Sequence, residues 1–118
     1  MSRLADTPPA PYFAVIFTSL RTAADEGYED TATRMLELAA SQPGFLGVES
    51  TRDPGGLGIT SSYWADLEAI SAWKQQLEHV HAQQRGRDQW YSHYHIRIAR
   101  VERDYAFSAA AAQTGDDL

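Results

Sequence analysis

The hydrophobic positions change period along the chain, and each change marks the boundary of a predicted element. Residues 12–19 (YFAVIFTS) are β-branched and aromatic, which is typical of a strand. Alternate positions are apolar on both sides, a pattern that indicates a strand covered on both faces. From residue 22 to 41 the apolar residues recur at helical spacing, which predicts a first helix. That stripe consists of Tyr28, Ala32, Met35 and Ala39, widened by Leu36 and Leu38.

A hairpin and a second helical segment follow. Residues 45–52 and 57–64 have the pattern of two strands, and the DPGG sequence at 53–56 is typical of the turn between them. Asp66 can cap the next helix by accepting hydrogen bonds from its first amides. The apolar positions of this helix are Leu67, Ile70, Trp73 and Leu77.

The last part of the pattern predicts more helix and then a final strand. Helical character continues after Leu77, with a break, as far as Trp90. Residues 91–105 then alternate as a strand. A shift in the apolar alternation predicts a β-bulge near Arg100. The inward set of this strand is Tyr94, Ile96 and Ile98.

These elements follow the order β-α-β-β-α-(α)-β, which is the ferredoxin-like α+β arrangement with a four-stranded antiparallel sheet. Its helices cover one face of the sheet, yet the first strand is apolar on both faces. A second copy of the sheet is the simplest cover for the other face, so we expect a homodimer formed through that face. We assign residues 12–106 to the folded domain and residues 1–11 and 107–118 to flexible tails.

Composition narrows the classes of function. A formal net charge of −6 argues against a nucleic-acid partner, because phosphate binding requires a basic surface. The absence of cysteine excludes disulfides, thiolate nucleophiles and Cys-ligated metals. No apolar run approaches the roughly 18 residues of a membrane span, and no signal-peptide pattern is visible. We therefore expect a soluble cytoplasmic protein without a membrane partner.

All four histidines fall within residues 78–95, as two His-x-His pairs. His79 and His81 lie on a predicted helix, where residues two apart point about 200° from each other and cannot share one ion. His93 and His95 share one face of a strand with Arg97, and a fixed cation beside a metal ion is unfavourable. We therefore predict no metal site.

A helical face that begins at His79 is the best candidate for a pocket wall. His79, Gln83, Gly86 and Trp90 fall on one side of the helix, and Gly86 indicates a break or a close approach. In this interpretation His79 is the group that handles a proton. The alternative is a helix edge with a solvated histidine and a core tryptophan.

Aromatic side chains would extend that wall toward a planar ligand. They equally serve ordinary cores and interfaces, and both interpretations stay open. The residues that we assign to substrate binding are Tyr63, Gln83, Trp90 and Phe17, beside Trp73 and His79.

Three segments give the chain a resemblance to a known family. QPGFLGVES (42–50), SYW (62–64) and AISAWKQQLEH (69–79) resemble the antibiotic biosynthesis monooxygenase (ABM) superfamily of dimeric α/β-barrel proteins. The superfamily includes cofactor-independent oxygenases, haem-degrading enzymes and members without proven activity. The resemblance is closest to its uncharacterised bacterial branch.

The resemblance also implies roles for particular residues. It gives Trp73 the role of the family tryptophan and His79 that of the family histidine. The chain contains no asparagine, so the hydrogen bond of the family asparagine would come from Ser19, Thr18 or Gln83.

The function expected from the resemblance is oxygenation of a small phenol- or hydroquinone-like aromatic molecule by O₂, without a cofactor. His79 would take the phenolic proton while the ligand stacks near Trp73. The alternatives are a non-catalytic small-ligand-binding dimer and a haem-binding or haem-degrading protein in which His79 is the axial ligand.

Overall fold

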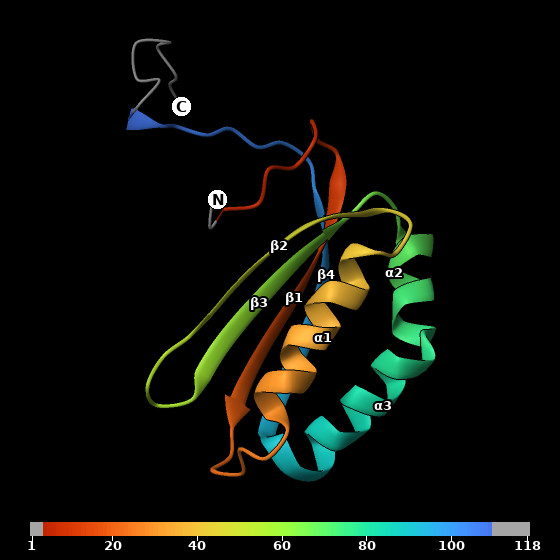
Figure 1. Cartoon of the computed structure of the whole chain (residues 1–118). Helices are drawn as coiled ribbons and strands as arrows, with labels where there is room; N and C mark the ends of the chain where they lie inside the picture. The colour runs from red at the N-terminus through yellow and green to blue at the C-terminus, as the bar shows by residue number, and fades with distance from the viewer. Residues whose placement is uncertain (1–3, 110–118) are drawn as a thin grey trace.

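A four-stranded antiparallel sheet carries all helices on one of its faces (Figure 1). The computed structural model describes residues 4–109, so parts of both predicted tails, 1–3 and 110–118, lie outside the described residues. The strand order is β2-β3-β1-β4, and the expected ferredoxin-like arrangement is confirmed. In chain order the elements are β1 (Tyr12–Arg21), α1 (Tyr28–Ala40), β2 (Phe45–Arg52), β3 (Leu57–Trp64), α2 (Leu67–Gln75), α3 (Leu77–Arg85), a π-helical turn (Gly86–Trp90) and β4 (Tyr91–Val101).

The β2–β3 hairpin has the bounds that the sequence predicts. Its turn closes because the amide of Asp53 donates to the Leu57 carbonyl at 2.8 Å. Gly56 has a φ of 100°, a conformation that other residues rarely adopt. Local turn chemistry therefore defines both strand ends.

The sequence predicts that the first helix begins at residue 22, but helix α1 begins at Tyr28. The segment before it is held by other contacts: the Thr22 amide donates to the Trp90 carbonyl at 2.8 Å. Gly27, with a φ of 78°, then turns the chain into the helix. The later helical region is also interrupted, but the break comes before Leu77 and not after it. Gln76 has a ψ of 128° and separates α2 from α3, so Leu77 belongs to α3.

The bulge predicted in strand β4 lies at a different residue. Its pairing with β1 is continuous from His93 to Val101, and the irregularity lies at Ser92 instead of Arg100. The apolar alternation therefore shifts without a break in the pairing. Tyr94, Ile96 and Ile98 face the helices as predicted, whereas Ala99 and Val101 lie on the opposite face. The strand ends at Val101, and the chain then leaves the sheet (Figure 1).

The helices are fixed to the sheet by a core around Trp64, which is fully buried. Ala39 of α1 and Ile70 of α2 pack against it. The Trp64 indole Nε1 donates to Ser62 Oγ at 2.9 Å, so its polar atom is satisfied. No helix among residues 4–109 is long and apolar enough to cross a membrane.

Candidate functional site

A cavity of about 450 Å³ lies between the sheet and the helices, and we call it the helix-face cavity. This volume falls in the range of small-molecule sites. Its walls are mostly apolar, with Phe17 and Val48 from the sheet and Met35 from α1 among them. An apolar wall lowers the local dielectric constant and strengthens electrostatic interactions beside it. The polar groups that do enter the cavity therefore decide what it can do.

His79 is the imidazole in that wall, and its geometry fixes which nitrogen is available. Its ring stacks on Trp73 with centroids 4.0 Å apart, and Nδ1 lies 2.8 Å from the Trp73 carbonyl oxygen. A carbonyl only accepts hydrogen bonds, so Nδ1 carries the hydrogen and Nε2 keeps a free lone pair. Burial lowers the pKa of His79, opposed in part by this hydrogen bond. The neutral ring is therefore favoured, which is the form that accepts a proton.

The stacking depends on the break between α2 and α3. In one continuous helix, residues six apart point about 240° from each other, so Trp73 and His79 would not meet. The extended backbone at Gln76 redirects the chain, and the Gln76 side chain caps α3 by accepting from the His79 amide at 3.0 Å. The Trp73 carbonyl lies in the last turn of α2, where it accepts from the Gln76 amide at 3.2 Å and has a second lone pair for the imidazole.

Five of the six predicted site residues line the helix-face cavity together. They are Phe17, Trp73, His79, Gln83 and Trp90. His81, by contrast, is exposed, so the two members of this His-x-His pair do face apart. Gly86 is buried, and a Cβ there would lie 2.9 Å from the Tyr91 ring, which explains the glycine by a close approach.

Tyr63 is the exception, and the expectation that it shares this wall is corrected. Neighbouring residues of a strand point to opposite faces, and Trp64 occupies the helix face. Tyr63 therefore points to the outer face of the sheet. Its hydroxyl donates to Glu49 at 2.6 Å, and its ring packs edge-on against Tyr12 at 5.8 Å.

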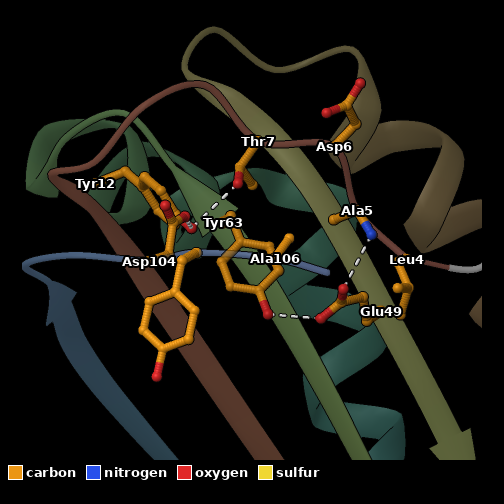
Figure 2. A pocket seen from close by; sticks show the side chains of 10 residues that line it. Leu4, Ala5, Asp6, Thr7, Tyr12, Glu49, Tyr63, Asp104 and Ala106 are labelled. Carbon is orange, nitrogen blue, oxygen red and sulfur yellow. Dashed lines mark hydrogen bonds between the residues drawn. The ribbon is translucent and has the colours of Figure 1, made fainter. Parts of the chain in front are cut away.

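These residues belong to a second pocket, of about 330 Å³, which we call the outer-face pocket (Figure 2). The chain segments near both ends of the described region close it. Figure 2 shows the hydroxyl of Tyr63 directed at Glu49, which also accepts from the Ala5 amide at 2.9 Å. The Tyr12 hydroxyl bonds to Asp104 and accepts from Thr7. Part of the predicted N-terminal tail thus contacts the sheet.

Sequence reasoning missed the polar cluster at the far end of the helix-face cavity. Arg52 donates to Ser19 Oγ at 2.9 Å and to the Tyr28 hydroxyl at 3.3 Å. Tyr28 and Tyr91 line the cavity, and their hydroxyl oxygens are 3.4 Å apart. Only tertiary contacts bring these residues together, so no local pattern marks them.

The three candidates for the family asparagine's hydrogen bond are now distinguished by position. Ser19 is buried and already bonded to Arg52. Thr18 lies on the outer face, next to Phe17 on the same strand. Gln83 lines the helix-face cavity and is the candidate that remains.

A metal ion finds no ready site in the part of the chain that the structure describes. Among residues 4–109 no group of three or more His, Asp or Glu side chains is placed to hold one. His93 and His95 are exposed on β4.

Comparison with known proteins identifies the family. Residues 11–85 match the antibiotic biosynthesis monooxygenase (ABM) family, and the chain belongs to it. It is 50% identical over 107 residues to the uncharacterized protein YqjZ of Bacillus subtilis. The aligned region covers 91% of this chain and 94% of YqjZ.

Solved structures share the fold at low sequence identity. A variant of SnoaB, a cofactor-independent oxygenase from Streptomyces nogalater, matches with a TM-score of 0.70 at 15% identity, over 80% of this chain and 97% of SnoaB. Rv0793 from Mycobacterium tuberculosis matches with a TM-score of 0.69 at 12% identity, over 83% of this chain and all of Rv0793. These likenesses concern the fold alone.

Proposed function

We propose that the protein is a cofactor-independent monooxygenase that acts on an electron-rich phenol in the helix-face cavity. The observation that carries the proposal is the free Nε2 lone pair of His79 in an apolar cavity, beside the ring of Trp73. Membership of the ABM family, and the likeness of fold to an oxygenase that needs no cofactor, support it.

The reaction divides into proton transfer, electron transfer and recombination. Nε2 of His79 takes the phenolic proton, and the resulting phenolate transfers one electron to O₂. The phenoxyl radical and superoxide recombine at the carbon para to the oxygen and form a peroxide, which receives the proton back from His79. Loss of water across the C–H and O–O bonds then gives a quinone. Each phenol thus consumes one O₂ and releases one water.

The protein contributes orientation, a dry cavity and a base of suitable strength. General-base assistance of this kind is worth about 10²–10⁴-fold in rate. The raised electron density of a phenolate in a water-poor cavity makes it a better electron donor, because the charge loses its hydration. Stacking between the phenol and Trp73 would hold the acidic oxygen near Nε2.

Oxygen uptake with 1,5-dihydroxynaphthalene tests the proposal, because its monooxygenation gives a coloured 1,4-quinone. We expect ¹⁸O₂ to place one labelled oxygen in the quinone. His79→Ala should lower turnover by about 10²-fold or more. His81→Ala, on the exposed side of the same helix, is the matched control and should keep full turnover. Unchanged turnover in His79→Ala would remove the base from the proposal.

The same samples separate the two rival functions. Tight binding of the phenol without oxygen uptake would identify a ligand-binding protein. A Soret band shift on addition of haemin that His79→Ala abolishes would identify haem binding through that residue. The cytoplasmic location expected from the sequence stays a prediction.

A homodimer through the outer face of the sheet is part of the proposal. Leu20 and Leu57 lie opposite each other on that face, and Ile59 lies near them. Their exposures are 42%, 44% and 43%, unusual for apolar side chains on a sheet. Sedimentation should show a dimer that Ile59→Lys dissociates. Leu67→Lys, at an exposed leucine of α2, should remain dimeric. A monomeric wild-type protein would contradict the proposal.

A further inference from the structure

We propose that the far end of the helix-face cavity is a carboxylate subsite. In this proposal Tyr28, held by Tyr91 and backed by Arg52, binds the acid group of the ligand, which is therefore an aromatic acid. The inference rests on the proposed use of this cavity as the binding site, but it does not depend on oxygen chemistry. Three independent features of the cluster support it.

Arg52 is a half-buried cation without a counter-ion. It donates to the Gly56 carbonyl at 2.6 Å and to Ser19 Oγ at 2.9 Å, and both partners are neutral. Among residues 4–109, its guanidinium takes part in none of the ion pairs, although Arg21 and Arg34 each pair with a carboxylate. An uncompensated charge away from bulk water is unfavourable, and an anionic ligand would compensate it.

The Tyr28 hydroxyl has a hydrogen left to donate. Its oxygen accepts from Arg52 at 3.3 Å and from Tyr91 at 3.4 Å. No hydrogen bond within the described residues uses its own hydrogen. Burial raises the pKa of Tyr91, so that hydroxyl also stays protonated at neutral pH. Because Tyr91 donates to Tyr28, the free donor is the Tyr28 hydroxyl. One phenolic donor in a largely apolar cavity suits an oxygen that only accepts, and the bond is stronger when that oxygen is charged.

The surrounding residues hold both tyrosine rings in place. The Arg21 guanidinium lies 3.5 Å from the centroid of the Tyr28 ring, and its own charge is met by Asp25 at 3.2 Å. Gly86 gives the Tyr91 ring its space. A rigidly held donor loses little conformational entropy on binding.

Charge balance selects a carboxylate over a phosphate. Of the two arginines at this cluster, Arg21 is paired with Asp25 and Arg52 is in none of the ion pairs of residues 4–109, so one positive charge is left to match one negative charge. A phosphate group would bring almost two charges at neutral pH. The two ends of the cavity therefore predict a ligand with a phenol near His79 and a carboxylate near Tyr28.

Titration calorimetry with 6-hydroxy-2-naphthoic acid and its methyl ester tests the subsite. The two probes share one ring system with the hydroxyl at the opposite end, and they differ in the charge of the acid group. We expect the acid to bind about tenfold more tightly than the ester to the wild-type protein. Tyr28→Phe should lose most of this preference, and Tyr91→Phe, which removes the donor that orients the Tyr28 hydroxyl, should lose part of it. Continued binding of the ester by both variants shows that they are folded.

Tyr63→Phe is the matched control, since it removes a tyrosine hydroxyl from the outer face, and it should keep the tenfold preference. Failure of the acid to bind, equal affinity for both probes, or an unchanged preference in both cavity variants would overturn the subsite. Calorimetry requires no turnover. A protein that prefers the acid but does not oxidise phenols would therefore sink the oxygenase proposal and leave the subsite standing.

Discussion

The two pockets of this protein contain similar residues and differ in how their polar groups are satisfied. In the outer-face pocket Tyr63 donates to Glu49, and Tyr12 is bonded to Asp104. In the helix-face cavity His79 keeps a free lone pair, and Tyr28 keeps a free donor hydrogen. Hydrogen-bond capacity left over in a largely apolar cavity is what a ligand can use. We therefore expect any chemistry on the helix face and a structural role for the outer-face pairs.

The largest effect should come from the core that supports the helix-face cavity. Trp64→Ala removes a fully buried ring that α1 and α2 both contact, and we expect it to lower the free energy of unfolding by about 3–5 kcal/mol. Urea unfolding followed by circular dichroism measures this. A loss as small as that of Tyr63→Phe, one residue away on the outer face, would contradict the assignment of the two faces.

The pH dependence of turnover should follow His79 alone. Its pKa lies below the ordinary 6.5, so we expect turnover to be constant above pH 6.5 and to fall about tenfold per pH unit below the lowered pKa. The hydrogen bond to Asp104 raises the pKa of Tyr12 above its usual 10. Burial, and then the hydrogen bond to Glu49, raise the pKa of Tyr63 in the same direction. The outer-face pocket should therefore add no step between pH 5 and 8.

The same histidine should leave a signature in stability. Because the folded state lowers its pKa, the unfolded chain takes up the proton first as pH falls. The contribution of His79 is then complete above about pH 6.5 and decreases from there down to the folded pKa. Comparing unfolding of the wild type with His79→Gln across this window isolates it. If the stability of the wild type relative to His79→Gln instead increased as pH falls, the pKa of His79 would be raised in the folded state, which would contradict this account.

The smallest effect should come from the outer-face pairs. Tyr12→Phe removes the hydroxyl that contacts Asp104 and Thr7, and it should lower the free energy of unfolding by about 1 kcal/mol. Turnover of 1,5-dihydroxynaphthalene should not change. A variant that keeps its stability but loses turnover would move the reacting site to the outer face.

The sequence predicted those elements whose signals are local. The DPGG turn set the bounds of β2 and β3, and the Asp66 cap is present, with its side chain accepting from the Ala69 amide at 2.7 Å. It also predicted that His79 and Trp73 belong to one wall. Their direct stacking could not be predicted, because it depends on an extended backbone at Gln76, a residue that favours helix as readily as its neighbours do.

Two further features depend on tertiary contacts. Tyr63 and Trp64 are adjacent aromatic residues on one strand, and only the core decides which of them faces the helices. Arg52 ends β2 like an ordinary surface residue, and the fold brings it to Ser19 and Tyr28. Contacts across such sequence distances leave no periodic signal along the chain.

A crystal structure of the protein with 6-hydroxy-2-naphthoic acid bound tests the central claim most directly. We predict the naphthalene ring in the helix-face cavity beside Trp73, its hydroxyl on Nε2 of His79, and its carboxylate against Tyr28 and Tyr91. The probe found in the outer-face pocket, between Tyr12 and Glu49, with the helix-face cavity empty, would contradict this account.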